Sequence, residues 1–264
     1  MKIVVCIKQV PDTNVVRLDP VTNTLIREGV PSIINPDDKA GLEAALQIKD
    51  TNPEEIEVTV LTMGPPQAEE ALREALAMGA DHAILLTDRA FGGADTWATS
   101  NTIAGALRNL NYDLIITGRQ AIDGDTAQVG PQIAEHLKLP QVSYVENVEP
   151  GEDYIRVRRQ FEDRYHILKV QLPCLITTLT ELSEPRYMSI GKIRDAYEKE
   201  ITIWGLADIE DKLDKANLGL KGSPTRVKKS FPKSGKGVGE KYDDLTSDEA
   251  AQKIIEKLKE KYII

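Results

Sequence analysis

Residues 112–137, YDLIITGRQAIDGDTAQVGPQIAEHL, decide the fold, because they join a buried strand, a polar loop and a helix in one short run. Tyr112–Thr117 is an apolar run of strand length, and Gln128–Leu137 has apolar residues at helical spacing. The loop between them holds two glycines and two aspartates, residue types that turn a chain. This order of elements predicts one repeat of an α/β fold.

The same order of strand, loop and helix occurs three more times upstream. Lys2–Ile7 is apolar and predicts the first strand, and the sequence NPDD from Asn35 predicts a helix start, with Asn35 as the cap and Pro36 as the first helical residue. Short loops between alternating strands and helices indicate a parallel sheet with helices on its faces. The predicted strands and helices that complete the pattern are Ile56–Thr62, a helix ended by Gly79, His82–Thr87 and Thr96–Leu110.

Past Pro140 the strand patterns follow one another without helices between them. We predict hairpin-like connections there and an antiparallel edge to the sheet, with strands at Ser143–Val148, Tyr154–Gln160, His166–Gln171 and Leu175–Thr180. A further small hairpin is predicted earlier in the chain, from Val15–Leu18 and Thr24–Ile26 around the turn sequence DPVTN.

The last part of the chain predicts an arm. From about Tyr197 the apolar pattern loses its period, and residues 220–242 are rich in Gly, Ser, Pro and Lys, too polar to form a core. A capping box at Thr246–Glu249 then starts a helix with a narrow apolar stripe at Ala250, Ile254, Leu258 and Tyr262. We therefore expect an α/β domain over residues 1–195 and a docking arm over 196–264.

Composition excludes several classes of protein. The chain has 264 residues, 41% of them hydrophobic and 28% charged, with a formal net charge of −9. This is too apolar for a disordered chain, and no uncharged run approaches the ~20 residues that cross a bilayer. The acidic balance disfavours nucleic acid as the main partner, and the start MKIVVCIKQVPD predicts a strand, not a secretory signal.

Side-chain catalysis and metal binding are also disfavoured. The two cysteines form no CxxC pattern, and the three histidines share no ligand spacing, so we expect no metal and no disulfide framework. Such cysteine usage predicts a reducing cytoplasm. The chain holds neither GxGxxG nor GxxxxGK[ST], so neither a standard dinucleotide fingerprint nor a P-loop is present.

A ligand is expected at the carboxyl ends of the parallel strands, where open α/β sheets bind theirs. In the Gly118–Thr126 loop, Gly118 allows close approach, and the backbone amides of Thr126 to Gly130 open a helix whose dipole favours a phosphate. Arg119 would add a charged clamp, and Asp123 and Asp125 would cap amides or bind hydroxyls. An ordinary helix cap beside a polar turn is the alternative.

The loop DRAFGGADT, residues 88–96, is a second candidate. Its glycines Gly92 and Gly93 permit close backbone approach, while Asp95 and Thr96 cap the following helix. The alternative is a flexible turn with an N-cap.

Six segments together resemble the β subunit of electron-transfer flavoproteins. They run from residue 2 to about 195, and the segments containing QAIDGDTAQ and EPRY are the most specific. The matching segments are VCIKQVPD (Val5–Asp12), NPDD (Asn35–Asp38), MGPP (Met63–Pro66), LAMGAD (Leu76–Asp81), GRQAIDGDTAQVGP (Gly118–Pro131) and EPRYMSIGKI (Glu184–Ile193).

This resemblance implies a Rossmann-like domain of the adenine nucleotide alpha hydrolase type that does not hydrolyse its nucleotide, paired with an α subunit on which the arm docks. One branch of the family holds AMP in the β subunit as a structural ligand. A second branch bifurcates electrons and holds FAD there, and the loop DRAFGGADT and the opening VCIKQVPDT resemble that branch. The glycines of the loop DRAFGGADT would leave room for the flavin.

The resemblance also implies the cofactor-binding residues. The adenosine half would meet the ends of two strands, the NPDD helix start and the loop from Gly118, and the extension of FAD would lie beside residues 91–96. The residues implied are Cys6, Asn35, Pro36, Asp37, Asp38, Met63, Phe91, Gly92, Asp95, Thr96, Gly118, Arg119, Gln120, Ala121, Ile122, Asp123, Gly124, Asp125, Thr126, Ala127, Gln128 and Val129.

The implied activity is electron transfer within a heterodimer. The chain would bind FAD, take electrons from NADH and pass them to ferredoxin or flavodoxin and, through the α-subunit flavin, to an acyl-CoA or 2-hydroxy acid dehydrogenase. The alternatives are an AMP-holding scaffold subunit and an ATP-binding sensor module, although the phosphate loop of such sensors is missing.

Overall fold

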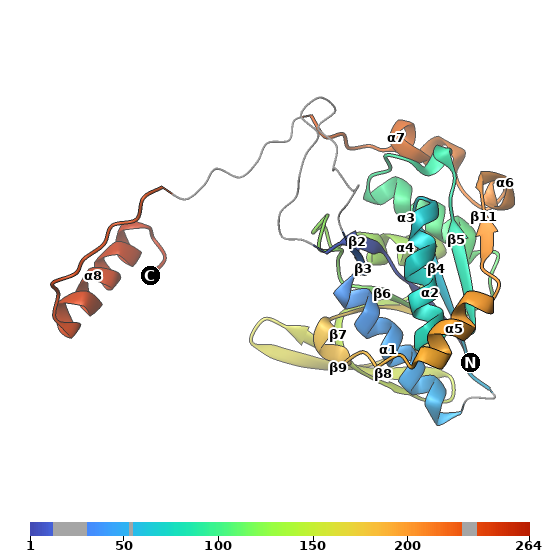
Figure 1. The fold of residues 1–264 in the computed structure, drawn as a ribbon, viewed down its shortest axis with the longest axis horizontal. Coiled ribbons are helices and arrows are strands. Elements are labelled where there is room, and N and C mark those ends of the chain that lie inside the picture. Colours follow the sequence, from blue (N-terminus) through green and yellow to red (C-terminus); the bar gives the residue numbers. More distant parts are fainter. Residues whose placement is uncertain (13–30, 53–54, 229–236) are drawn as a thin grey trace. The chain divides into compact units, whose positions relative to one another are not determined.

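The computed structural model describes residues 1–12, 31–52, 55–228 and 237–264. These residues form two compact units, Met1–Val227 and Lys228–Ile264. The first unit contains the α/β fold (Figure 1). The hairpin predicted around Val15–Leu18 and Thr24–Ile26 lies outside the described residues.

A nine-stranded sheet forms the centre of the first unit, in the order β11-β5-β4-β1-β6-β10-β7-β8-β9. Strands β11 to β7 are parallel, and β7, β8 and β9 are antiparallel. This confirms the predicted fold class, a parallel α/β sheet with an antiparallel edge. The strands are β1 Lys2–Cys6, β4 Glu57–Met63, β5 His82–Leu86, β6 Leu114–Gly118, β7 Gln141–Pro150, β8 Tyr154–Phe161, β9 Arg164–Gln171, β10 Cys174–Thr178 and β11 Thr202–Trp204; β2 Gln9–Pro11 and β3 Ser32–Ile34 form a separate pair.

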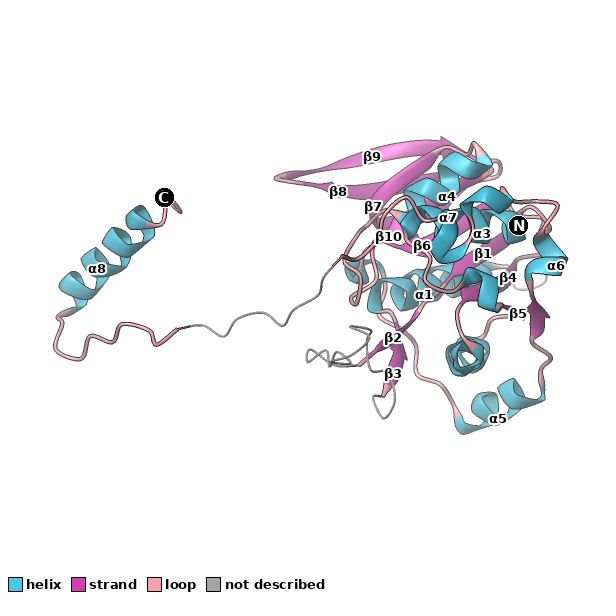
Figure 2. Cartoon of the chain, turned by 90° about the horizontal axis from the view of Figure 1, so that it is seen from above, coloured by secondary structure: helices cyan, strands magenta, loops and turns pink. Residues whose placement is uncertain are grey.

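Helices cover both faces of the sheet (Figures 1 and 2). One face buries Leu42 and Leu46 of α1 and Leu72 of α2 in one core cluster, and the other buries Leu107 of α3 and Ile133 of α4 in a second. The helices are α1 Pro36–Thr51, α2 Glu69–Met78, α3 Thr96–Leu107, α4 Val129–Leu137, α5 Ile190–Glu198, α6 Leu206–Ile209, α7 Gly219–Gly222 and α8 Ser247–Glu260, with 3-10 turns at Pro66–Ala68, Arg89–Phe91, Thr180–Leu182 and Lys215–Asn217.

The prediction for the last of the four later strands was wrong. Leu175–Thr180 was expected in the antiparallel edge, whereas β10 lies between β6 and β7 and pairs parallel with both. All five residues of β10 are buried, as in a strand covered on both faces. The order of the strands along the chain does not show that β10 lies beyond β8 and β7, in the interior of the sheet.

The compact unit ends at Val227, beyond the boundary expected at residue 195. The strand β11 pairs with β5 and becomes the sheet's edge. Arg73 of α2 holds the segment that leads into β11. Its Nη1 donates to the carbonyl oxygens of Ala196 at 2.8 Å and Lys199 at 2.6 Å. A three-residue strand carries no recognisable alternation of apolar residues, so the sequence does not reveal it.

The segment containing EPRY is tied to α1 by a buried ion pair. The Arg186 guanidinium donates to both carboxylate oxygens of Glu43, at 2.8 and 3.0 Å, and its backbone N–H donates to the same residue at 3.1 Å. Asp50, about two turns further along α1, accepts a further bond at 2.8 Å. This part of the family resemblance therefore has a structural role, as it fixes the chain that leads into α5.

In the second unit, α8 begins with the predicted capping box. The Thr246 backbone N–H donates to the Glu249 carboxylate at 2.9 Å, and the Glu249 N–H donates to the Thr246 hydroxyl at 3.4 Å. In the predicted apolar stripe, Ile254 is 62% and Tyr262 is 96% exposed, so the described residues of this unit leave both uncovered. In the part of the chain that the structure describes, no helix is long and apolar enough to cross a membrane.

Candidate functional site

The candidate site lies where the strand order changes direction, between β1 and β6. From β1 the chain runs to β4 on one side, whereas β6 lies on the other. At the carboxyl ends of these two strands, the Asp38 carboxylate accepts the Lys8 N–H and the Gly118 N–H, each at 2.8 Å. Asp38 thereby joins the two loops that an open α/β sheet uses for its ligand.

Burial raises the pKa of Asp38 to about 7, from an ordinary value near 3.8. The loss of hydration outweighs the stabilising hydrogen bonds from Lys8, Asn35 and Gly118, and the nearby Asp37 raises the pKa further. A carboxyl group with this pKa changes charge close to neutral pH.

The free energy of unfolding should therefore fall as pH rises from about 4 to about 7. In this window the unfolded chain has lost the Asp38 proton and the folded protein still holds it, so each step up in pH favours the unfolded state, by up to ~1.4 kcal/mol per pH unit. Urea unfolding at pH 4.5 and pH 8 measures this. The loss should be smaller in the Asp38→Asn variant, and equal losses in the two proteins would contradict the assignment.

Close packing of backbones fixes the geometry around Asp38. A Cβ atom on Gly118 would lie 2.1 Å from Asp38 Oδ1 and 2.8 Å from the Asp38 nitrogen. A Cβ on Gly41 would lie 2.7 Å from the Thr178 hydroxyl. The start of α1 therefore approaches β6 and β10 more closely than any residue but glycine permits, which keeps the site rigid before a ligand arrives.

Asn35 occupies the N-cap position of α1, as predicted, but its side chain does not have the role expected of a cap. Its side chain makes no capping bond. It reaches across to the loop after β6, where Nδ2 donates to the Gln120 carbonyl at 2.9 Å and Oδ1 accepts the Ile122 N–H at 3.0 Å. Asn35 is fully buried, so this amide replaces water as the hydrogen-bonding partner of the loop backbone and fixes its shape.

The loop from Gly118 is held at both of its aspartates. Lys8 Nζ donates to Asp123 Oδ1 at 2.6 Å, and the Gln120 amide bonds to Asp125. Asp125 and Ala127 have φ values of +53° and +52°, a left-handed conformation that costs a non-glycine residue energy. The sequence analysis expected these carboxylates to cap amides or bind hydroxyls; among the described residues they instead bond to the Lys8 ammonium and the Gln120 side chain.

The start of α4 is free to bind an anion. Its N-cap, Gln128, makes no side-chain capping bond, so the amides of the first turn have no capping acceptor within the described part of the chain. A Cβ on Gly130 would lie 2.5 Å from the Thr117 hydroxyl, so this turn also packs tightly against β6. Backbone amides at the start of a helix, with the helix dipole behind them, suit a phosphate or diphosphate.

Arg119 does not extend freely toward an anion, as the sequence analysis expected. Its Nε lies 3.3 Å from Asp37 Oδ2, and Thr180 donates to the other oxygen of Asp37 at 2.6 Å. The Arg119 side chain remains 35% exposed. Its positive charge is thus shared with Asp37, which is buried and would otherwise carry an unpaired charge.

The second loop agrees with the sequence in its cap and differs in its glycines. Asp95 accepts the Ala98 N–H at 3.1 Å and caps α3, as predicted. Gly93, however, faces Leu220, since a Cβ there would lie 3.1 Å from the Leu220 Cβ. The space expected for a flavin at this glycine is filled by the chain's own α7. Phe91 is also directed into the core, only 4% exposed.

The two helix starts lie next to each other. Thr96 at the start of α3 donates through its hydroxyl to the Gln128 side chain at 2.9 Å. Helices α3 and α4 therefore present their amino termini at the same edge of the sheet. The fold thus brings the loop from Gly118 to Val129 next to Asp95 and Thr96. Phe91 lies apart from them, in the core.

Three predicted residues lie at the ends of β1, β4 and α1. Cys6 is buried and burial raises its pKa to about 12, so the thiol stays neutral and unreactive. Met63 is partly buried at the end of β4, and Pro36 opens α1. Among the described residues, no cluster of three or more potential metal ligands is found.

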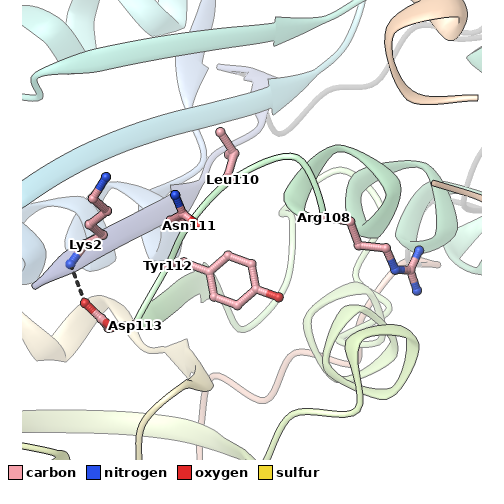
Figure 3. A pocket seen from close by; sticks show the side chains of 6 residues that line it. All are labelled: Lys2, Arg108, Leu110, Asn111, Tyr112 and Asp113. Atoms are coloured by element: carbon pink, nitrogen blue, oxygen red, sulfur yellow. Dashed lines mark hydrogen bonds between the residues drawn. The ribbon is translucent and has the colours of Figure 1, made fainter. Parts of the chain in front are cut away.

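A hollow of about 480 Å³ lies at the opposite edge of the sheet (Figure 3). It is lined by Lys2, Asn111 and Tyr112 at the amino ends of β1 and β6, and by Arg108. The Arg108 guanidinium is already bound to the carbonyl oxygens of Lys212 at 2.6 Å and His136 at 2.5 Å. Its open and polar lining gives it no feature of a nucleotide site.

Sequence reasoning missed two contributions to the site. Thr178 and Thr180, at the end of β10, bond to the backbone and side chain of Asp37. Residues 213–227 pack on the loop after β5 and on α3. The threonines could have been found from the sequence LITTLT, a strand that ends in hydroxyl residues. Residues 213–227 could not, because they follow a region without a periodic pattern.

Comparison with known proteins agrees with this geometry. The family described as "Electron transfer flavoprotein domain" matches residues 22–209. The "Electron transfer flavoprotein subunit beta" of Clostridium acetobutylicum is 61% identical over 264 residues, all of both chains. The "Caffeyl-CoA reductase-Etf complex subunit CarD" of Acetobacterium woodii is 59% identical, and the "Acryloyl-CoA reductase electron transfer subunit gamma" of Anaerotignum propionicum is 45% identical, again over the whole of each chain.

These matches run over the full length of each chain, so they cover the α/β unit as well as the arm. The chain belongs to the electron transfer flavoprotein family, as a β subunit.

Proposed function

We propose that this chain is the β subunit of an electron-bifurcating flavoprotein and binds FAD at the carboxyl edge of its sheet. The observation that carries the proposal is the uncapped start of α4 beside the rigid loop from Gly118. These backbone amides would hold the diphosphate of the dinucleotide. The ends of β1 and β4, at Cys6 and Met63, would border its adenosine half.

The residues present fit such a dinucleotide. A Cβ added to Gly124 would meet no atom within 4 Å, so the crest of the loop is open. Lys8 is 45% exposed beside the loop and offers a cation near the phosphates, besides holding Asp123. Because Leu220 lies against Gly93, the flavin half would extend past α7 and would not enter the glycine turn itself.

When bound, FAD would accept a hydride from NADH and return the two electrons singly, one to ferredoxin or flavodoxin and one through the α-subunit flavin to a dehydrogenase. The chain's own residues would bind, orient and tune the cofactor. The names of two relatives support a partner that acts on a CoA thioester, since they are called parts of caffeyl-CoA and acryloyl-CoA reductases. A 2-hydroxy acid dehydrogenase is the other partner class. Both cysteines are free and buried, which suits a cytoplasmic location.

The alternative is that the same amides hold AMP, with all redox chemistry left to the α subunit. The two cases differ in stoichiometry. Mass spectrometry of the nucleotides released from the purified heterodimer should find two FAD per heterodimer. One FAD and one AMP would reject bifurcation and support the scaffold role.

We also propose that the arm docks on the α subunit. An isolated helix of this length is only marginally stable in water, and its exposed isoleucines need a cover. Deletion of residues 242–264 should weaken the association of α and β by at least ~10-fold, about 1.4 kcal/mol, when measured by sedimentation or calorimetry. The matched control, Ala251→Ser on the same helix, should assemble normally. Normal assembly of the truncated chain would overturn this proposal.

A further inference from the structure

Residues 213–227, which we call the strap, cross the start of α3 and the loop after β5. The strap is buried at Gly219 and Ser223 and is held by α3. Asn101 of α3 is 3% exposed and donates to the carbonyl oxygens of Asp214 and Asn217, each at 3.0 Å. The strap is thus part of the first unit, and its last residue is the root from which the arm departs.

The strap and the loop meet backbone to backbone. A Cβ on Gly219 would lie 2.2 Å from the Ala90 carbonyl oxygen, and the Leu220 N–H donates to the Gly92 oxygen at 3.0 Å. Glycine is required on both sides of this contact, at Gly219 with φ +51° and Gly93 with φ +71°. Gly93 of this loop therefore accommodates the strap, which explains this glycine without a ligand.

A single carboxylate closes this contact at the edge of the candidate site. Asp95 Oδ2 accepts both the N–H of Thr225 at 2.9 Å and its hydroxyl at 2.7 Å, while Oδ1 accepts the Ala98 N–H. The Asp95 N–H in turn donates to the buried Ser223 hydroxyl at 2.8 Å. The same residue that caps α3 thus holds the end of the strap.

The next residue along α3 continues the connection to the nucleotide site. Thr96 bonds to Gln128, the N-cap of α4, whose first-turn amides are the proposed diphosphate ligands. Thr225 is therefore connected to Gln128 by its hydrogen bonds to Asp95, the peptide bond from Asp95 to Thr96, and the hydrogen bond from Thr96 to Gln128.

We propose that Asp95 and Thr225 form a latch that couples occupancy of the nucleotide site to the position of the strap, and so to the root of the docking arm. This inference rests on the proposed function, because it needs a nucleotide at the start of α4. A ligand that fixes Gln128 stabilises the start of α3, which fixes Asp95 and the strap end. By thermodynamic linkage, a latched strap must favour the ligand to the same extent.

Hydrogen exchange on the full chain tests the latch, with FAD as the probe and AMP in parallel. In the wild-type chain, FAD should slow exchange at residues 219–227. Thr225→Val removes the hydroxyl donor at an exposed position and should abolish this slowing and weaken FAD binding by roughly 5-fold. Thr225→Ser keeps the hydroxyl and should behave as the wild type.

The outcomes separate the latch from the proposed function. If FAD binds and the strap exchanges at an unchanged rate, or if Thr225→Val keeps the full slowing, the latch is overturned and the cofactor assignment stands. If AMP binds and slows the strap while FAD does not bind, the latch is supported and the FAD proposal fails. If neither nucleotide binds the wild-type chain, both are overturned.

Discussion

Gly118→Ala should destabilise the folded chain by about 3 kcal/mol and release its nucleotide. The added methyl group would lie 2.1 Å from Asp38 Oδ1, 2.8 Å from the Asp38 nitrogen and 2.9 Å from the Asp37 Cβ. The Asp38 nitrogen and the Asp37 Cβ are fixed by the backbone at the start of α1, so no side-chain rotation relieves the clash and the helix must move. Such a movement breaks the hydrogen bonds that Asp38 makes to both strand ends.

Urea unfolding and the amount of nucleotide retained per purified chain measure this effect. Gly124→Ala is the matched control in the same loop, because a methyl group there meets no atom within 4 Å. Its unfolding free energy should stay within ~0.5 kcal/mol of the wild type. Similar values for the two variants would show that the loop is loose and that the packing at Gly118 does not fix the site.

Glu43→Ala should cost about 3 kcal/mol of unfolding free energy. The Glu43 side chain is 4% exposed, and its removal leaves the Arg186 guanidinium, 23% exposed, without its principal partner. Because both carboxylate oxygens and the backbone N–H of Arg186 take part, the whole EPRY segment loses its attachment to α1. Thermal or urea unfolding of the purified chain gives the value.

Asp50→Ala is the control for the second ion pair of the same arginine. Asp50 is 61% exposed, so water screens its attraction to Arg186, and the loss should be below ~1 kcal/mol. An equal loss of unfolding free energy in both variants would mean that the burial of Glu43 does not strengthen its ion pair with Arg186. Only the number of negative charges near Arg186 would then matter.

The order of strands and helices could be predicted from the sequence because each element depends on neighbours close along the chain. Asp95 caps α3, and Thr246 and Glu249 form a capping box, through bonds that span three residues. Gly79 ends α2 with φ +136°, as its position after an amphipathic run indicates. Local rules of this kind also located the loop from Gly118 at a strand end.

The partners of polar side chains could not be predicted, because they lie far away in sequence. The pattern NPDD at Asn35 is the same as that of an ordinary N-cap, yet the amide bonds to a loop 85 residues away. The sequence suggested that Arg119 is free to bind an anion, but its guanidinium is paired with Asp37. Likewise, the glycines after β5 predict a close approach, but only the fold shows that the neighbour is Leu220.

The sheet ends in two very different margins. On one side β11 has three residues, whereas on the other β9 has eight, with Tyr165 and Ile167 more than half exposed on it. A long outer strand can recruit strands from other molecules, while a very short one cannot. Overproduction of this polypeptide without a partner subunit would therefore favour self-association along β9. The positive charges of Arg164 and Lys169 on this strand oppose such pairing.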